Sequence, residues 1–112
     1  MKRGEIYFAN LDPTIGSEIR KKRPVLIVSN DANNRTNSLI TIIPLTSNTK
    51  KIFPFETFIE KKNSGLKKDS KAQCHQIRTI SKSRITTKKV GSINKTIMEK
   101  IEHSIRLHLD IY

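Results

Sequence analysis

The residues best suited to chemistry form a run of four consecutive cations, Arg20 to Arg23, followed directly by Pro24. Proline fixes its own φ and favours an extended conformation for the residue before it, so Arg23 is predicted to be held rigidly at the start of a strand. The other cations, Arg20, Lys21 and Lys22, fall in the preceding loop. A positioned guanidinium beside mobile cations is suited to binding a polyanion, with the loop cations steering it.

Two hydroxyl residues, Thr46 and Ser47, follow Pro44 at the end of an apolar run. Because proline cannot donate a hydrogen bond to a neighbouring strand, we expect an edge or a bulge at Pro44, with both hydroxyls turned outward. Further along, residues 70–80 alternate without a clean apolar face. This pattern suggests a strand with a polar surface beside a binding site, which would present Gln76 and Arg78.

The remaining reactive side chains give no sign of a metal or covalent site. The helical spacing that a histidine pair needs for a metal ion is three or four residues, whereas His103 and His108 are five apart. The single cysteine, Cys74, has no nucleophile signature around it and is expected to be a small core residue. No nucleotide-binding glycine motif occurs. We therefore expect neither a metal nor a cofactor.

Composition points to an anionic partner. The chain has 112 residues, with 22 Lys and Arg against 10 Asp and Glu, giving a net charge of +12. These cations are spread along the chain, so nucleic acid is the first expectation, ahead of an anionic membrane surface or an acidic protein. No run is apolar for long enough to cross a bilayer. One cysteine agrees with a reducing compartment, and we expect a cytoplasmic protein.

The elements that would position these residues are short strands and one helix. Strands are predicted at residues 5–11, 24–30, 39–45, 55–60 and 70–80, with a short sixth at 86–91, and a cluster of turn residues at 31–38. From Asn94 onward the apolar residues recur at helical spacing to about Leu109. The expected fold is one mainly β domain over residues 1–112, a small barrel with a C-terminal helix over an open end.

Four segments, in this order and spacing, resemble the MazF/PemK toxin family. They are RGEIYFANLDPTIGSE, RPVLIVSN, PLTS and QIRTI, and with the terminal helix they cover nearly the whole chain. The resemblance implies an SH3-like barrel that forms a homodimer and acts as a metal-independent endoribonuclease on single-stranded RNA, chiefly mRNA. It also implies an acidic, MazE-like antitoxin, whose disordered tail would bind a chain of charge +12.

The resemblance carries catalytic roles to Arg23 of the RP segment and Thr46 of the PLTS segment, and it marks Glu18 as a further candidate. Some family members have an acidic residue where this chain has His75, so the family's proton-transfer roles do not transfer whole. Of the two candidate bases, we prefer His75, whose ordinary pKa is near 6.5, to Glu18. Arg23 stays protonated at neutral pH and is suited to binding the charge that develops on phosphate.

The sequence is also compatible with two other functions. The first is a gyrase-directed toxin of the CcdB type, which shares the barrel but needs no Arg and Thr site. The second is a barrel that binds nucleic acid, with steep salt dependence, and leaves it intact. An RNA digestion separates both from the endoribonuclease.

Overall fold

The apolar, β-branched runs of the chain form strands, and the polar segments between them form loops and short helical turns. The computed structural model describes residues 1–112. The strands are β1 (Glu5–Asn10), β2 (Lys22–Ile27), β3 (Leu39–Thr46), β4 (Glu56–Ile59), β5 (Ser70–Gln73), β6 (Arg78–Ser81) and β7 (Gly91–Ser92). The helices are α1 (Asp31–Thr36) and α2 (Lys95–Leu109), and the single-turn 3-10 helices are η1 (Lys61–Asn63), η2 (Cys74–Gln76) and η3 (Lys82–Arg84).

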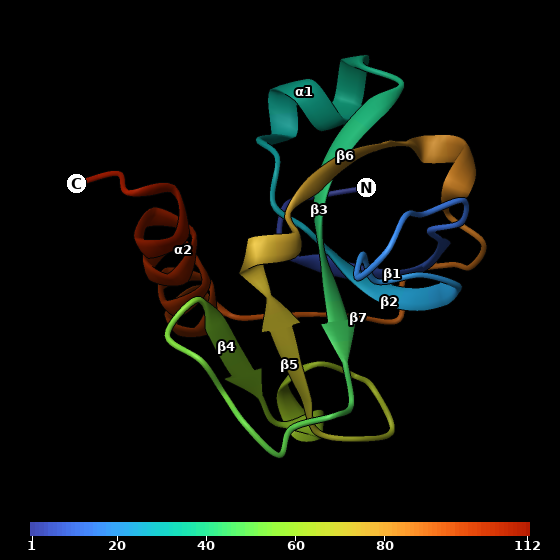
Figure 1. The fold of residues 1–112 in the computed structure, drawn as a ribbon. Coiled ribbons are helices and arrows are strands. Elements are labelled where there is room, and N and C mark those ends of the chain that lie inside the picture. Colours follow the sequence, from blue (N-terminus) through green and yellow to red (C-terminus); the bar gives the residue numbers. More distant parts are fainter.

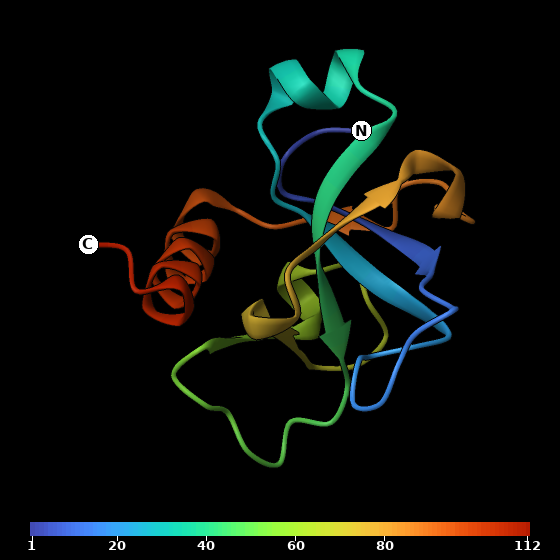
Figure 2. The same ribbon diagram turned by 45° about the horizontal axis from the view of Figure 1, so that its top comes forward.

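Strand β3 is the centre of the sheet. The strand order is β4-β5-β3-β2-β1-β7, with β6 also paired to β3, and every pairing is antiparallel. Helix α2 packs at one side of the curved sheet, beside β4 and η2 (Figures 1 and 2). The predicted mainly β architecture with a C-terminal helix is confirmed.

Two apolar clusters fill the two faces of this sheet. The first is closed by Ile97, Met98 and Ile101 of α2, which pack on residues such as Leu26 and Leu45. The second contains alternate residues of the same strands, including Val25 and Ile42. Because successive side chains of a strand point to opposite faces, β2 and β3 supply both clusters. Both faces of β2 are covered, since Val25, Leu26 and Ile27 are fully buried.

The predicted fifth strand over residues 70–80 is wrong as one element. It is divided into β5 and β6 by η2, and Pro44 lies opposite this break. Strand β3 pairs with β6 up to Ile42 and with β5 from Leu45, so Pro44 sits where β3 changes partner. Pro44 is therefore at neither an edge nor a bulge. On the β2 side Pro44 lies opposite Val25, but on the side of β3 that faces η2 no strand pairs with it, so its missing N–H is tolerated there.

Two further predictions need correction, and one holds. Residues 31–38, predicted as turns, include helix α1, whose N-cap Asn30 accepts a hydrogen bond from the Asn33 amide. The predicted last strand at 86–91 is reduced to β7. Helix α2 is confirmed, with the Asn94 side chain accepting from the Ile97 amide. No helix has the length and apolar character needed to cross a lipid bilayer.

Candidate functional site

The site is built on the adjoining ends of β2 and β3. The ladder between these strands ends at Val25 opposite Pro44, and two residues further its register reaches Arg23 and Thr46. Partners in an antiparallel register point to the same face, so these two side chains share the face of the second cluster. The opposite face receives Lys22 and Ser47. The register thus places Arg23 and Thr46 level with each other at the strand ends, while Arg23 also lines a pocket with Lys22 and Ser47.

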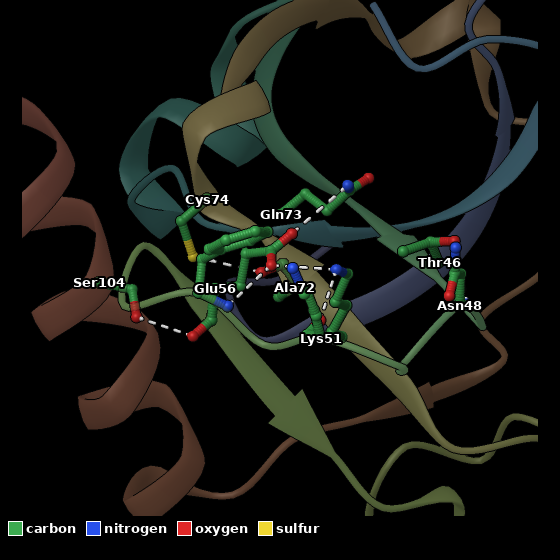
Figure 3. Close-up of polar contacts among 10 residues, drawn as sticks. Thr46, Asn48, Lys51, Glu56, Ala72, Gln73, Cys74 and Ser104 are labelled. Carbon is green, nitrogen blue, oxygen red and sulfur yellow. Dashed lines mark hydrogen bonds and ion pairs between the residues drawn. The ribbon is translucent and has the colours of Figure 1, made fainter.

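Both side chains keep donor groups free. The Arg23 Nε donates to the Arg20 carbonyl at 3.1 Å, while its two terminal nitrogens bind no protein group. Arg23 is half-buried, so this hydrogen bond and the strand restrict its position. The Thr46 Oγ1 accepts from the Asn48 amide at 3.3 Å, which leaves the hydroxyl proton available (Figure 3). Two hydrogen-bond donors are thereby held on one face for an anionic ligand.

The loop from β1 to β2, residues 11–21, is fastened by side chains from η2 and β6. Gln76 accepts from the Ile19 amide at 3.3 Å and donates to the Ser17 carbonyl at 3.4 Å, on either side of Glu18. Arg78 donates to the Leu11 carbonyl at 3.3 Å. Two residues predicted as RNA contacts therefore hold the loop that carries the candidate base Glu18.

The free cations of this loop are Arg20 and Lys21, which are exposed. The Lys21 backbone has a φ of 69°, and its carbonyl accepts from the Leu11 amide at 3.0 Å, which closes the loop. Glu18 is also exposed, and its carboxylate accepts from the Ile15 amide at 2.6 Å. The loop thus presents charged groups to solvent next to Arg23, as predicted for Arg20 and Lys21, whereas Lys22, predicted in the loop, begins β2.

The loop from β3 to β4, residues 47–55, is fastened instead by a buried ion pair. Lys71 Nζ lies 3.0 Å from Glu56 Oε1, with side chains only 9% and 2% exposed (Figure 3). Lys71 also donates to the Lys51 carbonyl at 2.8 Å, and Glu56 accepts from the Phe53 amide at 3.0 Å. Since Lys71 lies opposite Thr46 in the β3–β5 register, this pair supports the loop beside the site.

The surroundings of Glu56 lower the pKa of its carboxyl group. Burial alone would raise the pKa of Glu56, but the hydrogen bond from the Phe53 amide and the Lys71 ammonium together lower it below its usual value. Glu56 is therefore ionised at neutral pH. A hydrogen bond from Gln73 to the same carboxylate, at 3.5 Å, adds to this arrangement.

His75 lies in an aromatic cluster at the end of the second loop. Its ring meets Phe55 edge-on, with centroids 4.5 Å apart, and His108 lies at 6.2 Å. Phe55 stacks in turn on Phe53, which is 46% exposed. Burial lowers the pKa of His75. The ring is thus neutral at pH 7, and its buried Nδ1 has no hydrogen-bond partner.

The short helix η2 joins the two loops, because Gln76 holds one and the adjacent His75 contacts the other. The stacked pair Phe53 and Phe55 was missed in the sequence. The signal was present as two phenylalanines around Pro54, but the first lies outside the predicted strand and nothing local indicated that the two would stack. An exposed ring of this kind can stack on a nucleobase.

The other reactive residues are structural. Cys74 is fully buried, as predicted, and burial raises the pKa of its thiol to about 12, so it is not a nucleophile at neutral pH. His103 and His108 lie on the exposed surface of α2, as expected. No three His, Cys, Asp or Glu side chains come together in a way that could hold a metal ion.

Comparison with known proteins identifies relatives over the full length. Residues 2–109 match the family of PemK-like, MazF-like toxins of type II toxin-antitoxin systems. The chain is 38% identical over 117 residues to the endoribonuclease MazF9 of Mycobacterium tuberculosis, covering 100% of this chain and 98% of the relative. It is 36% identical over 110 residues to the endoribonuclease EndoA of Bacillus subtilis, covering 97% and 94%.

Solved structures share the fold. MazF of Deinococcus radiodurans superposes with a TM-score of 0.84 at 20% identity, covering 98% of this chain and 96% of that one. An endoribonuclease of a mycobacterial species, in complex with its cognate antitoxin, superposes with a TM-score of 0.82 at 23% identity, covering 100% and 97%. With the full-length match to the family and to two of its curated endoribonucleases, the chain belongs to the PemK-like, MazF-like toxins of type II toxin-antitoxin systems.

Proposed function

We propose that this protein is the toxin of a type II toxin-antitoxin system and cleaves single-stranded RNA, chiefly mRNA, at short sequences without a metal ion. The observation that carries the proposal is the placement of Arg23 and Thr46 at adjoining strand ends, on one face, with free donors. The curated relatives, which are endoribonucleases, support it.

The reaction is an internal transesterification that only RNA can undergo, because the attacking atom is the 2'-oxygen. The 2'-oxygen forms a bond to phosphorus, the bond from phosphorus to the 5'-oxygen breaks, and the products are a 2',3'-cyclic phosphate and a 5'-OH. Arg23 binds two phosphate oxygens through its fork of donors, and Thr46 donates to one of them. Such donors stabilise the extra negative charge of the transition state more than that of the substrate.

The proton of the 2'-OH goes to a general base, for which we propose His75. A neutral imidazole with a lowered pKa can accept a proton at neutral pH. The buried Nδ1 cannot reach RNA, so the accepting atom is Nε2, which makes no hydrogen bond to the protein. Glu18, on the loop held by Gln76, is the alternative. The 5'-oxygen takes a proton as it leaves.

Aromatic and cationic side chains near the site favour RNA over other anionic ligands. The exposed Phe53, stacked on Phe55, offers a surface for a base beside the phosphate site. Arg20 and Lys21 add charge on the neighbouring loop. We also propose a homodimer that acts in the cytoplasm and is inhibited by an acidic antitoxin, which a net charge of +12 favours.

The test is incubation of the protein with a long unstructured RNA in excess EDTA, with the fragment ends mapped. Wild-type protein is expected to give discrete cuts that end in cyclic phosphate, and Arg23→Ala is expected to give the same cuts at least about 10² times more slowly. Arg35→Ala removes an exposed cation from α1, remote in the chain from the site, and serves as the matched control that keeps cleavage. Intact RNA with wild-type protein contradicts the proposal, and a DNA gyrase supercoiling assay would then test the rival toxin class.

A further inference from the structure

A second concave surface lies on the opposite face of the same strand ends. It is a pocket of about 490 Å³, within the size range of small-molecule sites. The apolar part is formed by Phe8, Pro24, Leu45, Leu66 and Val90. The end of β2 (Lys22, Arg23 and Pro24), Leu45 of β3 and the following Ser47 line it, so its position is fixed by the strands that hold Arg23 and Thr46.

Cations surround this apolar surface without any acidic neighbour. Lys22, Lys67 and Lys68 line the pocket, and no Asp or Glu does. All three lysines are exposed, and none of their ammonium groups makes a hydrogen bond or ion pair. Ser47 and Ser70 add hydroxyl groups. The pocket therefore combines an apolar surface with several uncompensated positive charges.

Close backbone packing forms one wall of the pocket. Gly65 has a φ of 78°, and a Cβ at this position would lie 2.6 Å from the Val90 carbonyl oxygen. At Gly91 a Cβ would lie only 2.1 Å from the Ser64 carbonyl oxygen. Since no side chain fits between these backbones, the segment that carries Lys67 and Lys68 is held against the strand region. The pocket is preformed.

We propose that this pocket binds a nucleotide of the RNA strand that flanks the cleaved phosphate, with the base on the apolar surface and phosphates on Lys22, Lys67 and Lys68. The inference rests on the proposed function. Arg23 lines the pocket and also lies level with Thr46 in the register of β2 and β3. An RNA strand bound at Arg23 and Thr46 therefore needs only to cross the ends of these two β-strands to reach the pocket. Ser47, which was predicted as an RNA contact, would then contact the RNA inside this pocket.

An RNA strand fits these features better than an acidic peptide. A peptide carboxylate would satisfy the lysines, but the pocket combines its charges with an apolar surface in a volume of about 490 Å³, which suits a nucleobase as well as its phosphates. A free nucleotide shares this chemistry, and the experiment separates it from the strand. The adjacency to Arg23 favours the strand, because the two sites then bind successive parts of one chain.

The experiment measures binding of 2'-O-methyl RNA, which lacks the attacking hydroxyl and stays intact whether or not the protein is a ribonuclease. Oligonucleotides of about 6 and about 12 nucleotides, in the range that small single-strand-binding domains cover, are compared by fluorescence anisotropy at several salt concentrations. The variant is Lys67→Gln with Lys68→Gln. The control is Lys88→Gln with Lys95→Gln, which removes the same charge from exposed lysines outside the pocket.

Wild-type protein is expected to bind the longer RNA more tightly, and the pocket variant to lose this gain while it binds the shorter RNA as before. The slope of log K against log salt for the longer RNA should fall by about 0.7 for each phosphate contact removed. In methyl NMR spectra, the longer RNA should shift the Leu45, Leu66 and Val90 signals. The control variant should behave as wild type.

An equal loss in both variants, or unshifted methyl signals, overturns the proposal. Methyl shifts caused by uridine monophosphate or by a glutamate-rich peptide, but not by RNA, also overturn it and identify the other ligand class. Cleavage of unmodified RNA is scored separately. A protein that cleaves RNA with this pocket empty disproves only the pocket, whereas long-RNA binding without any cleavage disproves the proposed function.

Discussion

The two loops beside Arg23 and Thr46 are held in different ways. The β1–β2 loop is fastened by hydrogen bonds from the partly exposed side chains of Gln76 and Arg78 to its backbone. The β3–β4 loop is fastened by the buried pair of Lys71 and Glu56. Exposed hydrogen bonds contribute little net stability, whereas one member of a buried ion pair cannot be removed without leaving a desolvated charge.

The two kinds of contact imply that the β1–β2 loop can adapt to a ligand, whereas the β3–β4 loop contributes to the stability of the fold. The loop with the free cations Arg20 and Lys21 can move toward a ligand at small cost, because only a few weak contacts oppose the movement. The loop with the stacked phenylalanines stays in place because its anchor belongs to the interior. We therefore expect changes at the first anchor to alter RNA binding and changes at the second to alter folding.

The largest expected effect is on the cleavage rate, and it tests whether the general base is His75, beside the β3–β4 loop, or Glu18, on the β1–β2 loop. His75→Gln is predicted to lower kcat by about 10² to 10⁴, the usual contribution of a positioned base, and Glu18→Gln to lower it less. Because burial lowers the pKa of His75, the acid limb of the wild-type pH-rate profile should lie below the ordinary histidine range and vanish in His75→Gln. Retained activity with an unchanged profile would exclude His75 as the base.

The next effect is on stability. Glu56→Gln leaves the Lys71 ammonium buried without its partner and is predicted to lower the free energy of unfolding by about 3–5 kcal/mol, measured by urea denaturation. Glu60→Gln is the matched control, since Glu60 pairs with Lys62 at 3.5 Å on the surface. Exposed pairs contribute about 0–1 kcal/mol. Equal losses in the two variants would show that the buried pair does not anchor the structure.

The same pair predicts a pH dependence. The pKa of Glu56 is lower in the folded state than its ordinary 4.5, so its contribution to stability is complete above pH 4.5 and is lost as the pH falls through the folded value. Urea denaturation between neutral and acid pH should show this loss in wild-type protein and a smaller one in Glu56→Gln. Parallel curves for the two proteins would contradict the lowered pKa.

The smallest effect is expected at the anchor of the first loop. Gln76→Ala removes two hydrogen bonds to the loop and should cost only about 0.5–1.5 kcal/mol of stability. Faster amide hydrogen exchange should be confined to residues 11–21, and KM for RNA should rise more than kcat falls. A loss of stability as large as that of Glu56→Gln would remove the distinction between the loops.

The local sequence predicted most strands, although β2 begins at Lys22 and ends at Ile27 rather than spanning residues 24–30. Proline at positions 24 and 44 marked where Arg23 and Thr46 would lie, since proline limits the backbone in ways that depend only on its neighbours. The continuous apolar run of β2 and the helical periodicity of α2 were equally local signals. These signals were sufficient for the fold class and for the two residues at the centre of the proposed site.

The sequence could not reveal contacts between distant segments. Glu56 and Lys71 each looked like ordinary surface charges, and only the pairing of β4 with β5 buries them together. Gln76 and Arg78 were predicted to contact RNA, yet their side chains hold the β1–β2 loop. The division of residues 70–80 by η2 was also hidden, because it depends on where β3 changes its partner.

The most direct test of the account is a double-mutant cycle on Arg23 and Thr46, measured as single-turnover cleavage of an RNA with a mapped cut site. If both donors bind the same phosphate from one face, each alanine variant should lose about 10² to 10³ in rate, and the double variant little more than the worse single. Losses that multiply fully, or a double variant that cleaves at close to the wild-type rate, would contradict a joint site at these strand ends.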